Sequence, residues 1–277
     1  MAFIDVTVFA GVWSRIQLYE PMISESACDE TSVVLWIQVR HTIGPEHFSH
    51  RLLPQAPSGE FVDLRWLGQL GKSKLAEDWN VRLFKSFAGI ASCSHDGGDC
   101  IFTWKREIDY RPDGPPDVGK MVFLDHDQQL LQEDGVLAGD DYREVWRRLD
   151  GSMHNSFGGR CFLPDSPEAK GVIVVSGMHV GIAVRFAPTY DDGDCHSLAN
   201  IFAHGERCPS ASEQAALDNY FGLIACDGVV VCCSRPMLKG AALGCTVGSC
   251  MPGWSCQKRV HTHLPAQLQT VLACEQL

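Results

Sequence analysis

Four tryptophans in the sequence are each followed, two places later, by a side chain that carries a nitrogen donor. The pairs are Trp13 with Arg15, Trp36 with Gln38, Trp104 with Arg106, and Trp146 with Arg148. Lys, Arg and Gln make up about one residue in eight, so about one such pair is expected by chance among seven tryptophans. Residues two apart in a β-strand project from the same face of the sheet. The four pairs therefore predict aromatic sheet faces that also carry guanidinium or amide groups.

Inward-facing pairs would line a cavity with aromatic walls and a few donors, which suits a small apolar or acidic ligand. A guanidinium stacked on an indole gains about 0.5–1 kcal/mol when exposed and ~2 kcal/mol when desolvated. Burying an unpaired cation costs several kcal/mol, so an interior arginine needs a protein carboxylate, an ordered water or a ligand anion. Tyr142 and Glu144 share the predicted strand face of Trp146 and Arg148. Glu144 is the first candidate counter-charge, and Glu133 is the second.

A structural role for these pairs is the alternative interpretation. Arginine stems can cover exposed indoles on the outside of a sheet, and internal ion pairs can simply fix a fold. His179 also has both a functional and a structural interpretation. It lies amid Val175, Gly177, Gly181 and Ala183 on one predicted strand face. It could be an acid or base in a pocket, a haem ligand, or a hydrogen-bonded core residue.

Three functions fit these residues. The first is a binding protein that encloses a small apolar or acidic ligand or presents its surface to a protein partner. The second is a cofactor-free isomerase or cyclase with Glu144 or His179 as general acid or base. The third is a haem or metal carrier. We favour the binding protein, with no catalytic residue and no cofactor assigned. Nucleophilic catalysis is not indicated, since the sequence has no G-x-S-x-G nucleophile motif.

Metal-binding patterns are weak. The acidic stretches at 125–127 and 191–196 lack EF-hand spacing. His261 and His263, with Cys250 and Cys256 upstream, could bind zinc only if their segment places both rings on one face. Nine of the thirteen cysteines follow residue 194, and none has C-x-x-C spacing. We expect free thiols and no metal site.

Strand-like segments dominate the first 150 residues, separated by Gly- and Pro-rich turn signals. Eight segments have the composition or alternation of strands: 11–19, 32–40, 61–66, 87–93, 100–110, 118–124, 128–133 and 141–149. This number of short strands predicts a mainly β fold, as a closed antiparallel barrel or a sandwich. One short helix is predicted over 74–84, where Leu75, Trp79 and Leu83 recur at four-residue spacing.

The second half has longer apolar runs. Residues 158–171 are interpreted as a loop, and 172–186 as one long strand in which Gly177 and Gly181 permit bending. Strands at 220–226 and 229–235 are joined by Asp227-Gly228, a strong hairpin signal.

The strand pattern ends near residue 246. We expect one barrel domain over residues 8–245, or alternatively two smaller barrels over 8–150 and 160–245. Residues 246–277 are predicted to be a Cys-rich tail of uncertain order.

The composition excludes several classes of protein. The formal charge of −11 comes with no Lys/Arg cluster that could neutralise phosphates, so a nucleic-acid partner is not expected. No apolar run reaches about 18 residues, so no membrane span is expected. The N-terminus has no basic region before its apolar stretch, which argues against a secretory signal. We expect a cytoplasmic protein.

The order of several motifs resembles a known family. In chain order they are GVWSR, VVLWIQ, VDLRW, SFAGIAS, TWKREIDY, PDVGKM, LLQEDG, DYREVWRRLD and VIVVSGMHVGIAV, which span about residues 11–186. This order is similar to that of a lipocalin-like β-barrel family that includes a yeast casein-kinase-interacting protein built of two barrels. The resemblance implies a barrel with an internal cavity, an intracellular location and no established catalytic residues.

Overall fold

The computed structural model describes residues 11–19, 34–38, 58–66, 84–96, 99–109, 117–137, 140–149, 157–186, 219–257, 261–262 and 264–275. These ranges are mainly β-strands, arranged as a closed barrel and a second sheet. The predicted fold class, a mainly β protein with an antiparallel barrel, is confirmed. Of the short helix predicted over 74–84, residues 74–83 lie outside the described residues.

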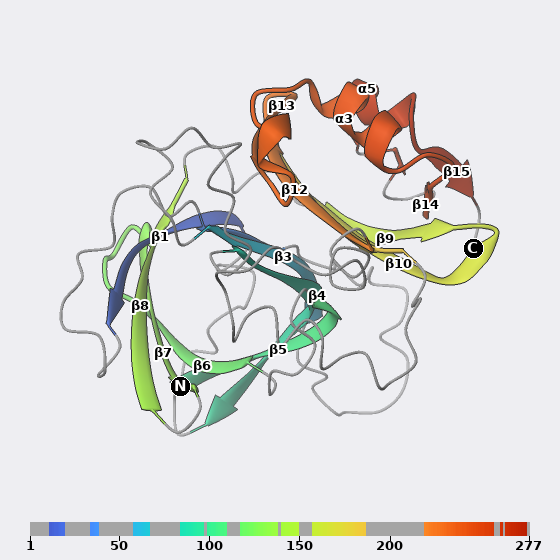
Figure 1. Cartoon of the computed structure of the whole chain (residues 1–277). Helices are drawn as coiled ribbons and strands as arrows, with labels where there is room; N and C mark the ends of the chain where they lie inside the picture. The colour runs from blue at the N-terminus through green and yellow to red at the C-terminus, as the bar shows by residue number, and fades with distance from the viewer. Residues whose placement is uncertain are drawn as a thin grey trace, which may run out of the picture.

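Eight strands close the barrel, because each pairs with the next along the chain and β1 pairs with β8 (Figure 1). They are β1 (Gly11–Tyr19), β2 (Val34–Gln38), β3 (Ser58–Trp66), β4 (Phe84–Asp96), β5 (Asp99–Asp109), β6 (Asp117–Phe123), β7 (Leu130–Leu137) and β8 (Asp140–Arg148). Each overlaps a predicted strand. In β5, buried Phe102 and Trp104 alternate with the more exposed Thr103 and Lys105, which is the period of a strand with one buried face.

The second sheet has seven strands in the order β13-β12-β11-β10-β9-β14-β15. Their bounds are β9 (Phe157–Leu163), β10 (Ser166–Ser176), β11 (His179–Arg185), β12 (Tyr220–Cys226), β13 (Val229–Cys233), β14 (Ser255–Gln257) and β15 (Ala273–Glu275). Neighbours are antiparallel except β14 and β15, which are parallel. Asp227 and Gly228 both have positive φ in the tight turn between β12 and β13, so the predicted hairpin is confirmed.

Two predictions for this half are wrong. The predicted loop over 158–171 forms β9 and the start of β10. The single strand predicted over 172–186 is a hairpin, in which β10 ends at Ser176 and β11 begins at His179. Gly177 has a φ of 59°, a left-handed conformation that lets the chain reverse within two residues. The residues on both sides of the turn are equally apolar. One long bent strand and a hairpin of two strands therefore have the same sequence pattern.

The last part of the chain covers one face of the second sheet. It contains the 3-10 helix η5 (Pro236–Leu238), α3 (Leu243–Cys250) and α5 (Ala266–Gln269), together with β14 and β15. Val247, Trp254 and Leu268 pack into a buried core with Ile182 and Leu223 of the sheet. Residues 246–277 therefore include ordered elements, each too short to show a period in sequence. No described helix is long and apolar enough to cross a membrane.

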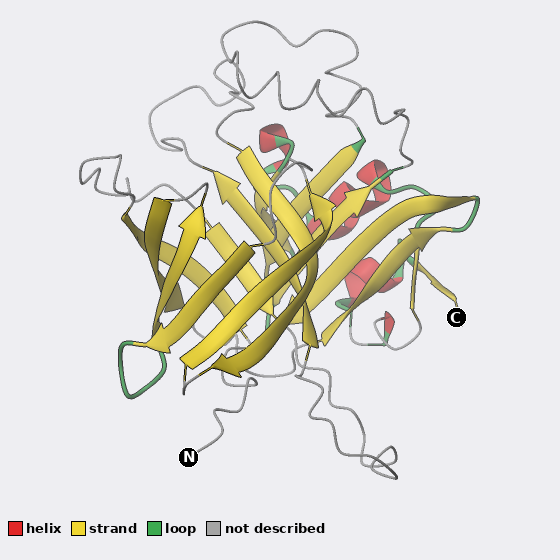
Figure 2. Cartoon of the chain, turned by 90° about the horizontal axis from the view of Figure 1, so that it is seen from below, coloured by secondary structure: helices red, strands yellow, loops and turns green. Residues whose placement is uncertain are grey.

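The opposite face of the second sheet packs against the barrel, so the molecule has three layers: barrel, sheet and helices (Figures 1 and 2). β10 contacts β2, β3 and β5. Val172 and Val174 of the sheet and Val62, Leu64 and Ala88 on the outer side of the barrel are fully buried. Burying each of these valine and leucine side chains is worth about 1.5–3 kcal/mol. The division of the chain into one or two domains stays a prediction.

A β-bulge in β5 sets which side chains enter the barrel. Gly89 of β4 is opposite Arg106, and its neighbour Ala88 is opposite Ile108, so β5 has one extra residue there. Arg106 therefore shares the inner face with Trp104, whereas Ile108 lies on the outer face. The rule that residues two apart share a face would place Arg106 and Ile108 on one face, and the bulge is an exception to it. A Cβ at Gly89 would collide with the Lys105 carbonyl, so the bulge requires glycine there.

Candidate functional site

Arg106 lies on the inner face of the barrel, with its charge matched by two carboxylates. Its Nη1 donates to Asp109 Oδ2 at 3.1 Å, and its Nη2 donates to Asp117 Oδ2 at 3.2 Å. The guanidinium lies over the ring of Phe87, with Cζ 4.3 Å from the ring centroid. An interior arginine requires such counter-charges. Here they are aspartates of β5 and β6 instead of the two glutamates predicted for this role.

Tyr142 connects Asp117 to the deeper part of the barrel. Its hydroxyl lies 2.7 Å from Glu133 Oε1 and 3.1 Å from Asp117 Oδ1. A tyrosine carries one hydroxyl hydrogen, so it donates to one of these carboxylates at a time. Burial, together with the two carboxylates, raises the pKa of Tyr142, which keeps the phenol protonated at neutral pH. Glu133 also accepts a hydrogen bond of 3.1 Å from Trp146 Nε1.

Trp104 and Trp146 belong to one buried aromatic cluster in the barrel. Their exposed fractions are 5% and 2%, and Trp104 stacks on Phe102 with ring centroids 5.7 Å apart. The other buried members are Phe61, Phe87, Ala91, Cys93, Cys100, Met121 and Leu131. These two predicted site residues thus lie together, beside the polar network of Arg106 and Tyr142.

Glu144 and Arg148 are also buried on β8. Glu144 is directly opposite Glu133 in the pairing of β7 with β8. The Arg148 guanidinium lies 5.9 Å from the centroid of Phe123. Burial lowers the pKa of Arg148, and the attraction of Asp125 partly opposes this shift.

The pairs in β1 and β2 are placed by strand register. Trp13 is opposite Trp36 and Arg148, and Arg15 is opposite Trp146. Gln38 is the register partner of Phe61. The side chains of Trp13, Arg15, Trp36 and Gln38 lie outside the described part of the structure, so their membership of a pocket stays a prediction.

His179 lies in the second sheet, at the start of β11, and not in the barrel wall. It is 7% exposed, and its Nδ1 is buried with no hydrogen-bond partner among the described residues. Burial lowers the pKa of His179, which the backbone of Ser176 partly opposes. The structure therefore does not bring His179 together with Glu144 and the tryptophans.

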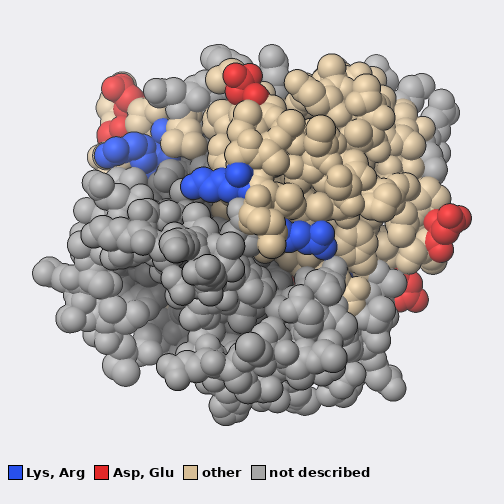
Figure 3. Space-filling model, turned by 45° about the horizontal axis from the view of Figure 1, so that its top comes forward, with Lys and Arg blue, Asp and Glu red and all other residues tan. Residues whose placement is uncertain are grey.

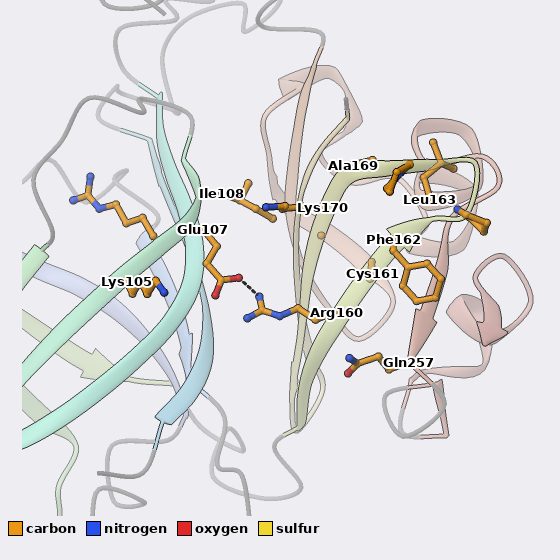
Figure 4. A pocket seen from close by; sticks show the side chains of 14 residues that line it. Lys105, Glu107, Ile108, Arg160, Cys161, Phe162, Leu163, Ala169, Lys170 and Gln257 are labelled. Carbon is orange, nitrogen blue, oxygen red and sulfur yellow. Dashed lines mark ion pairs between the residues drawn. The ribbon is translucent and has the colours of Figure 1, made fainter. Parts of the chain in front are cut away.

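A crevice of about 880 Å³ lies between the barrel and the second sheet, lined by β5 on one side and by β9 and β10 on the other. Its apolar lining residues are Ile108, Cys161, Phe162, Leu163, Pro164, Pro167, Ala169 and Gly171. Figure 4 shows Lys170 reaching from the second sheet toward β5, and Glu107 and Arg160 pointing toward one another. Their ion pair, 2.8 Å long, joins the two walls.

The crevice carries positive charge that the described residues do not neutralise. Lys105 and Lys170 are exposed lining residues and form no ion pair or hydrogen bond with any residue in the described ranges. Only Glu107 brings a negative charge to the lining, and Arg160 matches it. This arrangement contrasts with the net charge of −11 of the whole chain. On the face shown in Figure 3, by comparison, charged side chains are scattered over a mostly uncharged described surface.

Sequence reasoning missed the crevice residues. Lys105 and Glu107 were part of the TWKREIDY motif, but the residues of interest were those on its other face. Arg160 and Lys170 lay in the segment interpreted as a loop. The available signal was a basic residue on each of the three strands that line the crevice: Lys105, Arg160 and Lys170. This signal has meaning only once the packing of the strands is known.

Metal and thiol chemistry find little support in the described ranges. No group of three or more His, Cys, Asp or Glu there is arranged to hold a metal ion. The described cysteines are free thiols. Cys161 is directly opposite Cys256, and burial raises the pKa of both thiols, that of Cys256 to about 11. They are therefore protonated at neutral pH.

Comparison with known proteins gives a family. A family model described as "Protein HRI1" matches residues 32–187, which is more than half of the chain. No curated protein matches the chain. A solved structure from Saccharomyces cerevisiae, titled as the uncharacterized protein YLR301w, is similar with a TM-score of 0.46 and 11% identity, covering 78% of this chain and 80% of that one. The lipocalin-like and kinase-related details of the sequence resemblance stay predictions. The chain belongs to the HRI1 family.

Proposed function

We propose that the protein is a binding protein that holds a small apolar molecule with an acidic group in the crevice between barrel and second sheet. The observation that carries this proposal is the position of Lys105 and Lys170, exposed and without a described partner, beside an apolar wall. Ligand pockets of proteins combine a mainly apolar lining with a few polar groups that fix orientation, and they have volumes of about 300–1,000 Å³. The crevice fits this description.

The ligand class is that predicted from the sequence, but the proposed place is different. Inside the barrel, Arg106 already meets Asp109 and Asp117, and Tyr142 and Trp146 already donate to Glu133. An acid placed there would compete with protein carboxylates for the same donors. The lysines of the crevice have no such competitor in the described residues. A cytoplasmic location and a protein partner stay predictions of the sequence.

Fluorescence titration with anilinonaphthalene sulfonate, an apolar anion, tests the proposal. Exposed ion contacts are worth about 0.2–1 kcal/mol each, so replacing both Lys105 and Lys170 by Met should raise the Kd by about two- to thirtyfold. Lys120→Met is the matched control, because Lys120 is half-exposed on β6 and paired with Asp99 at 2.7 Å. An unchanged Kd in the double variant, or an equal change in the control, would remove the crevice as the site.

The enzyme alternative predicted from the sequence placed an acid or base inside the barrel. It named Glu144 or His179 for this role. Glu144 lies on β8 of the barrel, whereas His179 lies on β11 of the second sheet. No contact in the described residues favours turnover over binding, and we propose none.

A further inference from the structure

A further cation, on β11, stands beside Lys170 of the crevice. In the pairing of β10 with β11, Lys170 is directly opposite Arg185. Directly opposite residues project from the same face of a sheet. The next pair, Gly171 with Val184, belongs to the other face, where Val184 packs into the core under α3. Lys170 and Arg185 therefore both face the barrel, and their sheet contacts β5 through β10 and β11.

This pair of cations has no counter-charge among the described residues. Like charges directly opposite one another destabilise a sheet. Neither Lys170 nor Arg185 forms an ion pair in the described ranges, and Arg185 Nε is buried with no hydrogen-bond partner there. A buried donor left without an acceptor costs free energy unless a bound group supplies the acceptor. The two cations and the free donor all point to a bound anion.

The number and type of these groups indicate a doubly charged anion. A guanidinium presents donors in a planar fork that matches phosphate oxygens, and an ammonium adds a separate point charge. A phosphate monoester carries about −1.5 to −2 charges at neutral pH and three strong acceptor oxygens, whereas a carboxylate carries one charge and two oxygens. The carboxylate of Glu107 in the crevice lining is already matched by Arg160. Lys170 and Arg185 therefore remain available to a bound anion.

We infer that Lys170 and Arg185 form a phosphate subsite, so that the ligand of the crevice is an apolar phosphate monoester with its organic part against Phe162 and Ile108. The inference rests on the proposed function, and it adds that a phosphate is preferred over a carboxylate on an equal apolar chain. A phosphate monoester on an apolar chain occurs both in soluble phosphate esters and in membrane lipids, so either could supply the ligand.

Competition against anilinonaphthalene sulfonate tests the inference with two probes of equal chain, dodecyl phosphate and dodecanoate. The full-length protein should bind dodecyl phosphate at least tenfold more tightly. Arg185→Met should remove most of this preference and change the affinity for dodecanoate by less than about threefold. Arg147→Met is the matched control, since Arg147 is an exposed arginine of β8. If Arg185→Met does not fold, Lys170→Met serves the same comparison.

Equal affinity for the two probes, or a preference that survives in both variants, would overturn the phosphate subsite and leave the proposed function intact. Failure of both probes to compete with the sulfonate would overturn both. Two further arms separate the sources of the head group: flotation with phosphatidylcholine vesicles containing phosphatidic acid, and competition by inorganic phosphate. Arg185-dependent binding in either arm supports the subsite and identifies its source.

Discussion

The inside of the barrel and the crevice beside it differ in whether a carboxylate pairs with each cation. Arg106, on the inner face of β5, is held by two aspartates and stacked on Phe87. Lys105, the preceding residue, projects from the outer face and has no partner among the described residues. One strand thus carries one cation that serves the fold and one that is available to a ligand. A matched charge stabilises the structure, while the unmatched charge of Lys105 is the one that we propose for ligand binding.

The largest effect is expected from Trp146→Ala, which breaks the interior network. Trp146 is 2% exposed, and its Nε1 donates to Glu133. Truncating a buried aromatic residue to alanine costs about 3–5 kcal/mol, and here Glu133 also loses a donor. Urea denaturation followed by circular dichroism should show this loss in the free energy of unfolding. Trp146→Phe, which retains most of the volume, should lose about half as much, and a loss below 1 kcal/mol in the alanine variant would contradict the packed interior.

Arg106→Met compared with Lys105→Met tests the contrast directly. Removing Arg106 leaves Asp109 and Asp117 facing each other without their cation, and we expect a loss of about 2–3 kcal/mol of stability. Lys105→Met should change stability by less than about 0.5 kcal/mol, as exposed substitutions do. Arg106 also lines the crevice, but its guanidinium is held by Asp109 and Asp117. Binding of the sulfonate probe should therefore weaken more in Lys105→Met than in Arg106→Met. Weaker probe binding in Arg106→Met with unchanged stability would reverse the two roles.

The barrel could be predicted from the sequence because each of its strands and turns has a recognisable pattern within a few neighbouring residues. Each strand has its own alternation or composition, and the turn signals between strands fix their number. The tryptophan pairs also predicted that Trp104 and Trp146 share one interior, and both lie in its buried cluster. The bulge could not be predicted, because an extra residue after Arg106 changes no hydrophobic period until the partner strand is known.

The crevice could not be predicted because its walls are separated by about fifty residues. Lys105 and Lys170 each look like an ordinary surface lysine within their own strands. Only the packing of β10 against β5 brings them to one site. The first wall was recognised as a strand, but the second was interpreted as a loop, since the turn of 163–166 interrupts its pattern. Tertiary packing is thus the missing information, and local periodicity does not contain it.

Glu107→Gln sharpens the comparison by converting a matched cation into an unmatched one. In the present structure Arg160 is paired with Glu107 across the crevice. Losing the carboxylate frees Arg160 and removes a repelling charge, so the affinity for the sulfonate probe should rise about two- to fivefold. The gain should shrink in 1 M NaCl, where the screening length is about 3 Å. Glu168→Gln, at an exposed and unpaired position of β10 in the described structure, is the control. A fall in affinity would show that Glu107 helps binding.

The smallest expected effect concerns His179, which is at the opposite end of the same sheet face from Lys170 and Arg185. Burial lowers the pKa of His179 in the folded protein below its usual value. As the pH falls through the unfolded value of about 6.5, the unfolded chain therefore binds a proton that the folded chain resists, and stability decreases. Wild type should lose about 1 kcal/mol or less between pH 7.5 and 5.5 relative to His179→Gln, in matched urea titrations.

Ionisable groups that titrate equally in wild type and His179→Gln contribute equally to the two losses of stability, so they cancel in the comparison. This includes groups near Cys226, which is directly opposite His179. If wild type and His179→Gln lose the same free energy of unfolding between pH 7.5 and 5.5, His179 becomes protonated in the folded protein. The end of this sheet face near the turn then tolerates a positive charge. The distinction between the two ends of the face would then fail. If wild type alone loses the extra stability, burial excludes charge near the turn, and the cations at Lys170 and Arg185 are a local property of the crevice.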